Sequence, residues 1–467
     1  MSLLKGGVTD CIEKMAEVNL ELGSGGQGVG KKTEEEMMAS HLGIFDPPMV
    51  ESGTIDKREC IYPPTQSIAS GGPFTFIIPG EMGYYIDPST IRVRGSFKVQ
   101  KIVNGAPTDL ADGADDEKVS VVNNIGASLF DGVNVDFNGH NVTINSTVNS
   151  HYKAYIEAIG SYGKDAVDTH LLASGFLMDE GDFDKADNAG AKKRMKWIKK
   201  SQKVAFSSML QSDVLNCGKI LLDDMNVTIS LTRNKDSFLL HKKADDQVVY
   251  KLVILDLELR LVKVRLNSRI ASEINSKLAS GQRAQYHLTR TAIKSFTVPS
   301  GSTSLALNNV IAGAMPQQLI AGLVDQDAVN GNQEKNGFNF ENYKVNDFYF
   351  LVNNQEMPSG HYKPDWASLA YRKEFALFYE QILGGNMNTG TQITEENYKK
   401  GCTLYAVDLT PDSCSAYHNH DMDRGSVSIY GGFSGATTKN LTLILYASYN
   451  DTIEIDNERN VYKVRQI

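Results

Sequence analysis

The sequence lacks the segments with which proteins enter or cross membranes. No stretch approaches the roughly 18 consecutive apolar residues that span a bilayer, and the opening residues MSLLKGGVTDCIEKM lack the apolar core of a signal peptide. Cysteine is also scarce, with five residues among 467 and no Cys-x-x-Cys pair. These absences predict reduced thiols in a protein that stays on the cytosolic side, and they argue against a disulfide framework or a zinc site.

Positive charge is in the minority. The chain has 47 Lys and Arg residues against 56 Asp and Glu residues, which gives a formal net charge of −9. This balance argues against a protein that coats nucleic acid or lies on an anionic membrane. With 41% hydrophobic residues, 40 Gly and 13 Pro, the composition also excludes collagen, a long coiled coil and wholesale disorder.

From residue 63 onward, the chain consists of short apolar segments separated by Gly, Asn, Asp and Pro, a pattern typical of an all-β protein. The clearest predicted strand is Leu255–Leu261, where apolar and charged residues alternate with period two. Further strands are predicted at 91–99, 133–139, 225–231, 346–354, 425–433 and 441–449. Helical periodicity is convincing only at 152–162 and 366–383.

An internal repeat divides these segments into two halves. Phe76-Ile-Ile-Pro79-Gly80 is echoed by Phe296-Thr-Val-Pro299-Ser-Gly301, and each half then has a strand, a helix and a closing apolar strand, which ends near Leu266 or Glu454. Two copies of one β domain are the simplest interpretation. The predicted domains are an N-terminal arm at 1–62, a first β domain at 63–268, a linker at 269–288 and a second β domain at 289–467.

The arm contains a glycine run with weak similarity to nucleotide-binding motifs. Gly23-x-Gly25-x-x-Gly28 resembles the first motif of class I methyltransferases, but the alternating strands and helices that should follow are missing. A Walker A loop fails because Lys32 stands where Ser or Thr should hold magnesium. The run is therefore more typical of a flexible linker between short amphipathic and acidic segments.

Two polar clusters suggest metal ions. His418, His420, Asp421 and Asp423 could bind a transition metal as in cupins, but Arg424 stands where a cupin needs Glu, so a polar loop is favoured. The run Asp179–Asp187 is similar to a calcium loop with its Gly and distal Glu misplaced, and we expect a solvated turn. Because no nucleophile or metalloprotease motif is present, no catalytic, cofactor-binding or metal-binding residue is predicted, and no enzyme.

One basic run stands out. Lys192, Lys193, Arg194 and Lys196 begin a cationic stretch that continues to Lys203. A solvated loop between strands is the interpretation we favour, with a nuclear-import signal or a phosphate-facing patch as alternatives. The favoured interpretation predicts that replacing these four residues with Gln leaves the melting temperature almost unchanged.

Several longer segments resemble one family. They are YPPTQS (62–67), FIIPGEMGYYIDPSTIRVRGSF (76–97), VNNIGASLFDGVNVDFNG (122–139), YKAYIEAIGSYG (152–163), RNKDSFLL (233–240), FTVPSGS (296–302), GLVDQDAVNG (322–331), TLYAVDLTPD (403–412) and YASYNDTIEIDNERNV (446–461). In this order they are similar to the major capsid proteins of Polinton (Maverick) and adintovirus-like elements. The resemblance covers about 62–467, and the arm has no counterpart in it.

This resemblance implies a double jelly roll, in which two tandem eight-stranded jelly rolls carry a few short helices and an N-terminal arm. It further implies homotrimeric, pseudo-hexagonal capsomers that tile an icosahedral virion shell, assembled in the host nucleus or cytoplasm. Implied partners are further copies of the chain and a penton or minor capsid protein, with no sequence-specific nucleic acid and no transmembrane segment. A cupin-like metal-dependent enzyme and a host binding module derived from a captured capsid gene stay open as alternatives.

Overall fold

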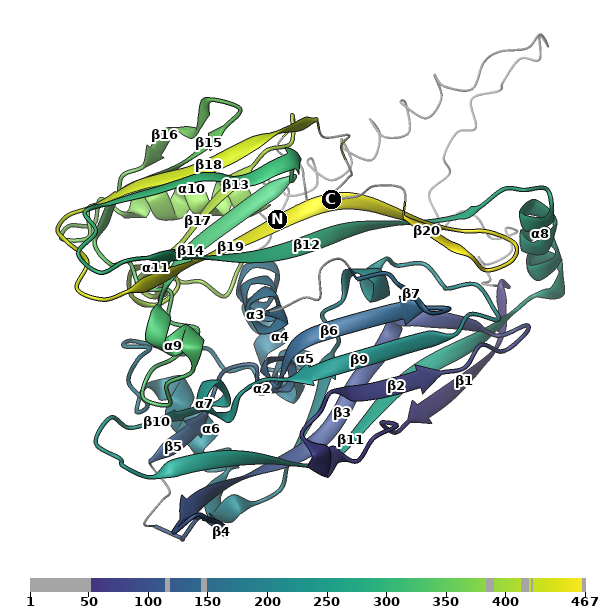
Figure 1. Cartoon of the computed structure of the whole chain (residues 1–467), viewed down its shortest axis with the longest axis horizontal. Helices are drawn as coiled ribbons and strands as arrows, with labels where there is room; N and C mark the ends of the chain where they lie inside the picture. Colours follow the sequence, from purple (N-terminus) through teal and green to yellow (C-terminus); the bar gives the residue numbers. More distant parts are fainter. Residues whose placement is uncertain are drawn as a thin grey trace, which may run out of the picture. The chain divides into compact units, whose positions relative to one another are not determined.

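Alternating apolar residues build two pairs of packed antiparallel sheets in the computed structural model of the chain (Figure 1). The structure describes residues 52–113, 118–143, 149–383, 390–412, 420 and 423–463. All of these residues belong to one unit, Ser52–Ile467. Residues 1–51, with the glycine run, lie outside the described residues.

The first pair of sheets forms the first jelly roll. Its larger sheet has the order β1-β11-β3-β4, with β8 paired to β3, and its smaller sheet has the order β2-β9-β6-β7. The strands of the larger sheet are β1 (Thr54–Tyr62), β3 (Tyr85–Val103), β4 (Ala106–Asp109), β8 (Val204–Met209) and β11 (Val249–Leu266). Those of the smaller sheet are β2 (Phe74–Ile78), β6 (Phe130–Phe137), β7 (His140–Asn141) and β9 (Val227–Arg233).

The second pair of sheets repeats this order. The larger sheet is β12-β19-β14-β17, with β20 added to β19, and the smaller sheet is β13-β18-β15-β16. Strands of the larger sheet are β12 (Ala284–Val298), β14 (Gln318–Asp325), β17 (Leu404–Asp408), β19 (Leu441–Ile455) and β20 (Val461–Lys463). Strands of the smaller sheet are β13 (Ser304–Ala314), β15 (Val345–Val352), β16 (Gln355–Tyr362) and β18 (Arg424–Phe433). The match of β1-β11-β3-β8 with β12-β19-β14-β17 confirms the predicted double jelly roll.

The predicted alternation is present in β11. Leu257, Leu259 and Leu261 are buried, whereas Glu258 and Arg260 between them are partly exposed. Leu255 departs from the pattern, with 41% of its surface exposed, because the register of β11 against β3 shifts between Ile254 and Asp256.

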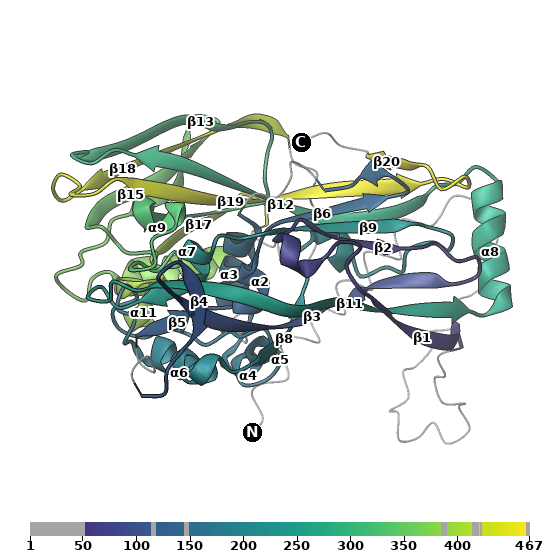
Figure 2. The ribbon, with the colours of Figure 1, turned by 60° about the horizontal axis from the view of Figure 1, so that its bottom comes forward.

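Two strands lie outside the predicted domain bounds. Residues 54–62, predicted as part of the arm, form β1, which pairs with β11 from Thr54–Leu266 to Tyr62–Leu259. The sequence of β1 shows no alternation of apolar and polar residues, because an edge strand exposes most of its side chains and the central residues of β1 are charged. β12 starts at Ala284, inside the predicted linker, after helix α8 (Ser268–Ala279), which joins the two jelly rolls at one end (Figure 2).

The similar segments Phe76–Gly80 and Phe296–Gly301 do not lie in equivalent strands of the two jelly rolls. Phe76–Gly80 runs out of β2, the second strand of its jelly roll, whereas Phe296–Gly301 runs out of β12, the first strand. The two predicted helices do occupy equivalent places, since α3 (Ser150–Ser161) follows β7 and α10 (Arg372–Leu383) follows β16. α10 starts later than predicted, and Trp366 precedes it.

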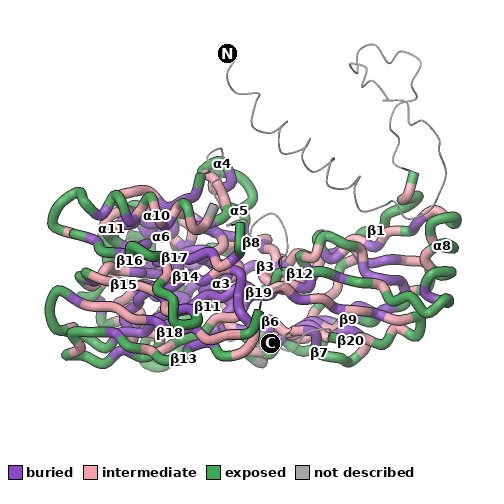
Figure 3. Tube along the Cα trace, turned by 90° about the horizontal axis from the view of Figure 1, so that it is seen from above, coloured by how far each residue is buried: buried purple, intermediate pink, exposed green. Residues whose placement is uncertain are grey.

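The remaining elements are short and lie in the connections between strands. The helices are α2 (Ile125–Ser128), α4 (Lys164–Val167), α5 (His170–Ala173), α6 (Ala189–Trp197), α7 (Asp236–Leu239), α9 (Gln326–Asn330) and α11 (Glu395–Lys400). Three 3-10 turns are η2 (Ile68–Ser70), η3 (Lys199–Ser201) and η4 (Asp213–Asn216), and β5 (Val119–Val121) pairs with β10 (Leu240–Lys242). Burial follows the strand interiors, while β1 and α8 are largely exposed (Figure 3).

Candidate functional site

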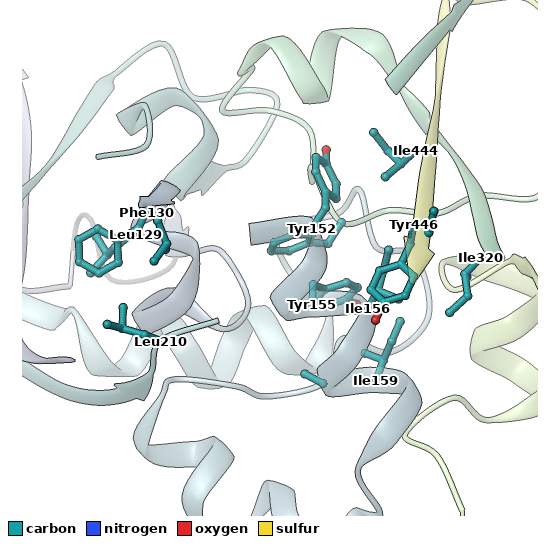
Figure 4. Packing of buried hydrophobic residues seen from close by; sticks show 14 of the residues in the cluster. Leu129, Phe130, Tyr152, Tyr155, Ile156, Ile159, Leu210, Ile320, Ile444 and Tyr446 are labelled. Carbon is teal, nitrogen blue, oxygen red and sulfur yellow. The ribbon is translucent and has the colours of Figure 1, made fainter. Parts of the chain in front are cut away.

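The two jelly rolls meet at helix α3. This helix belongs to the first jelly roll and lies against the outer face of the larger sheet of the second, where Ile156 and Ile159 approach Ile320, Ile444 and Tyr446 (Figure 4). All five side chains are buried. Because burying one aliphatic side chain contributes about 1.5–3 kcal/mol, this contact holds the two jelly rolls in one arrangement.

A charged cluster lies within the same contact. Lys153 is only 2% exposed, and its ammonium forms an ion pair with Asp213 and lies 3.8 Å from Glu157 Oε1. The second jelly roll completes the cluster, since Thr291 N donates to Asp213 Oδ2 at 2.8 Å and the Tyr446 hydroxyl donates to Glu157 at 3.2 Å. Lys153 therefore holds together two carboxylates, Asp213 of η4 and Glu157 of α3, and these carboxylates bind β12 and β19 of the second jelly roll.

The electrostatics of this cluster follow from its burial. Burial lowers the pKa of Lys153, but the neighbouring carboxylates of Asp213 and Glu157 more than offset this effect, so that its pKa is raised overall. Burial also raises the pKa of Glu157, and the adjacent charge of Asp213 adds to the rise. Lys153 stays charged, and removing it would leave two carboxylates close together without their counter-ion.

A second ion pair lies further along the junction. Arg290 of β12 and Asp451 of β19 are 4% and 2% exposed, and Arg290 Nε lies 2.5 Å from Asp451 Oδ2. Arg290 Nη1 also donates to the Val142 carbonyl of the first jelly roll at 2.8 Å. The guanidinium thus pairs within its own sheet and binds the backbone of the neighbouring jelly roll.

A cluster of aromatic rings also joins the two jelly rolls. Tyr155 of α3 stacks on Phe338 of the second jelly roll, with ring centroids 4.2 Å apart and an interplanar angle of 6°. Tyr152 of α3 and Phe238 of α7 both contact the Phe338 ring edge-on, each with an interplanar angle of 89°. Edge-to-face and stacked pairs add to the burial of these rings, so the aromatic cluster resists separation of the two jelly rolls.

The close approach at this cluster requires glycine at position 337. A Cβ atom there would lie 2.2 Å from Cε2 of Phe238, which is itself buried. Gly337→Ala should therefore lower the free energy of unfolding by about 1–3 kcal/mol through overpacking, measured by urea denaturation. The matched control is Gly435→Ala, because a Cβ atom there meets nothing within 4 Å. Equal stability of the two variants would contradict the close packing.

The basic run is only partly a solvated segment. Lys192, Lys193 and Lys196 are exposed, but Arg194 is 1% exposed, and its guanidinium lies 2.7 Å from Oδ1 of the buried Asp179. The prediction that all four cationic side chains are exposed is wrong, because the run forms α6 and its helical period turns Arg194 inward. Whether the run acts in nuclear import stays a prediction.

The side chain of Arg194 in α6 also donates to two backbone carbonyls. Its Nε donates to the Val121 carbonyl at 2.9 Å and its Nη1 to the Leu177 carbonyl at 2.7 Å. Asp179, expected in a solvated turn, is instead a buried counter-ion that also accepts from Asn336 Nδ2 of the second jelly roll at 3.3 Å. The acidic and basic stretches of the sequence thus pair with each other.

The other candidate residues form no site in the part of the chain that is described. His418 and Asp421 lie outside the described residues, and His420 Nε2 lies 2.8 Å from Asp412 Oδ1. Within residues 52–463, outside the gaps in the description, no group of three or more His, Cys, Asp or Glu side chains could hold a metal ion. No described helix is long and apolar enough to cross a membrane.

Sequence reasoning missed the junction residues. Lys153, Asp213, Arg290 and Asp451 belong to no motif, and their role depends on partners far along the chain. The available signal was a charged residue within an otherwise apolar segment, as at Lys153 and Glu157 in YKAYIEAI. Such a charge is seldom buried without a partner, so it marks a buried pair without identifying the second member.

The chain is similar to known proteins in sequence and in fold. No protein-family model matches the chain. An uncharacterized protein of Caenorhabditis elegans is 21% identical over 396 residues, which cover 83% of this chain and 92% of that protein. A chain in the structure of the Sputnik virophage is similar with a TM-score of 0.62 and 12% identity, covering 95% of this chain and 94% of that one.

Two further structures share the fold. A chain of the PBCV-1 virus capsid has a TM-score of 0.55 at 10% identity and covers 91% of this chain and 100% of that one. The mavirus major capsid protein has a TM-score of 0.50 at 10% identity and covers 93% of this chain and 96% of that one. These neighbours are double jelly-roll major capsid proteins, and the similarity extends over nearly the whole chain.

Proposed function

We propose that the chain is a structural major capsid protein, three copies of which form a pseudo-hexagonal capsomer that tiles an icosahedral shell. The observation that carries this proposal is the pair of jelly rolls with one strand order, held together by a buried junction. If three copies surround a threefold axis, six similar domains occupy the corners of a near-hexagon. The fold shared with virophage and PBCV-1 capsid chains supports this role.

Rigidity is what a shell requires of such a subunit. Two packed sheets make a stiff domain, and the loops between strands can vary without disturbing the core. The junction extends this stiffness to the whole unit, because Asp213 and Arg290 each bind residues of both jelly rolls. The partners in this proposal are further copies of the chain and a penton or minor capsid protein, and the site of action is the virion.

Within this role, we assign the chain to the Polinton and adintovirus-like capsid proteins. The segments quoted above support the assignment, as does the similarity in fold to the mavirus major capsid protein. The related protein of Caenorhabditis elegans is also consistent with a second candidate, a host binding module derived from a captured capsid gene. The two candidates differ in whether the purified protein assembles into particles.

The oligomeric state tests the proposal. Light scattering coupled to gel filtration should give about three times the chain mass of 51.3 kDa, since capsomer interfaces are large and obligate. Negative-stain images of the same peak should show near-hexagonal particles. A stable monomer at all concentrations contradicts the capsid role, and a trimer that never forms shells while binding a host ligand favours the second candidate.

The segment before β1 is proposed to act after the trimer has formed. Subunits of a shell meet neighbours in slightly different geometries, and a tethered arm adapts where a rigid domain cannot. Deleting residues 1–50 should preserve the trimer and its melting temperature while preventing closed particles or making their size irregular. Particle size measured by negative-stain microscopy checks this, and normal particles from the truncated chain would refute the role of the arm.

A further inference from the structure

The larger sheets of the two jelly rolls differ in how their outer faces are covered. In the second jelly roll, the residues of β14, β17 and β19 are almost all buried on both faces of the sheet. In the first, β1 is exposed along most of its length, and β11 is buried only at alternate positions. One sheet is therefore covered on both sides, whereas its counterpart has one face that no described residue covers.

The open face is defined by the outward residues of β1, β11 and β3. They are Ile61 and Glu59 in β1, Arg260 and Val262 in β11, and Arg92 and Arg94 in β3. Ile61, Arg260 and Arg92 lie side by side across the three strands, as Ile293, Tyr446 and Ile320 do in the second jelly roll. Ile61 is 57% exposed, so this face presents a large apolar side chain among its charged residues.

The chain itself shows what covers the equivalent face. In the second jelly roll, Tyr446 and Ile320 lie under α3, the helix that follows β7 of the first jelly roll. The counterpart of α3 is α10, which has the same length of 12 residues and follows the equivalent strand β16. Both connections are anchored alike, since Ser150 Oγ donates to the Phe130 carbonyl at 2.9 Å and Trp366 Nε1 to the Val345 carbonyl at 2.7 Å.

α10 has an uncovered side where α3 has none. Almost every residue of α3 is buried, including the charged Lys153. On α10, the residues Arg372, Ala376 and Glu380 follow one another at four-residue spacing and are all exposed. Among residues 52–463, apart from the gaps in the description, the chain thus carries two sheet faces and two helices of this kind but pairs only one face with one helix.

We propose that the open face of one copy binds the exposed side of α10 from a second copy, repeating between chains the contact that α3 makes within a chain. This inference rests on the proposed capsomer and names the surfaces that would form it. A contact between two different surfaces of identical chains is head-to-tail, and such contacts close into a ring when the rotation allows. Each subunit of a trimeric ring then uses one open face and one α10.

Charge supports this choice of partner. Arg94 on the open face and Glu380 on α10 form no ion pair with any other residue in the described part of the chain. Both surfaces otherwise mix signs, with Glu59 paired to Arg260 on one and Arg372 paired to Glu395 on the other. A contact between Arg94 and Glu380 would pair two charges that form no ion pair among the described residues.

A charge-swap experiment tests the inference. Arg94→Glu and Glu380→Arg should each raise the dissociation constant of the trimer at least tenfold, because like charges meet at the contact. The double variant should recover most of the affinity. Lys192→Glu is the matched control, since Lys192 is exposed and lies on neither surface. Mass photometry over a dilution series measures the trimer fraction, with tryptophan fluorescence as a check of folding.

The outcomes separate this inference from the function on which it rests. A wild-type chain that is never trimeric overturns the capsomer and this inference together. A wild-type trimer that is unaffected by the single variants, or not restored by the double variant, overturns only the inference. Cross-linking of the wild-type trimer with a short lysine reagent is independent of any variant: it should join Lys373 on α10 to Lys57 or Lys98 of another copy, and links only between other surfaces overturn the inference.

Discussion

Arg194→Gln should lower the free energy of unfolding by about 3–5 kcal/mol, the usual cost of removing one partner from a buried ion pair. The substitution leaves Asp179, which is 0% exposed, without its counter-ion, and it removes the donors to the Val121 and Leu177 carbonyls. Urea denaturation followed by tryptophan fluorescence measures the loss. The two tryptophans of the chain report on different regions, since Trp197 ends α6 and Trp366 lies in the second jelly roll.

The neighbouring lysines are the matched control. The triple variant Lys192→Gln, Lys193→Gln, Lys196→Gln should change stability by no more than about 0.5 kcal/mol, as exposed substitutions usually do. Adding Asp179→Asn to Arg194→Gln should cost less than the sum of the two single changes, because the pair is lost only once. If Arg194→Gln is as mild as the lysine variants, Arg194 is not a buried ion-pair partner.

Lys153→Met should weaken the junction of the two jelly rolls by a similar amount, about 3–5 kcal/mol. Methionine retains the apolar stem but leaves Asp213 and Glu157 facing each other without a cation. Burial and the nearby charge of Asp213 already raise the pKa of Glu157, and loss of Lys153 removes the opposing effect. Glu157 should then take up a proton more readily, so that the variant loses less stability at low pH than at neutral pH.

An exposed lysine provides the comparison. Lys164→Met, at the start of α4, should change the unfolding free energy by no more than about 0.5 kcal/mol at any pH. Denaturation of both variants at pH 5 and pH 8 checks the prediction. A loss that is equal at the two pH values would show that Glu157 does not titrate with the cluster, and no loss at all would contradict the buried pair.

Much of the fold follows from local patterns in the sequence. Alternating segments such as Leu257–Leu261 predict strands because side chains of a strand point to opposite faces, and the order of strands and helices predicts two copies of one domain. Edge strands and register shifts cannot be predicted from such local patterns. β1 was missed since its exposed, charged residues carry no alternation, and the register shift near Leu255 depends on how β11 pairs with β3.

By itself, the periodicity of the sequence determined that this chain is an all-β protein of two similar domains with two longer helices at equivalent places, because these properties follow from patterns within short segments. The jelly-roll fold of these domains was implied by the family resemblance. Only the tertiary structure decided which charges are solvated and which are buried. Lys192 and Arg194 are two residues apart, yet one is exposed and the other pairs with Asp179. The partners of Lys153 and Arg290 also come from distant segments, and such pairings arise only when the sheets and helices pack together.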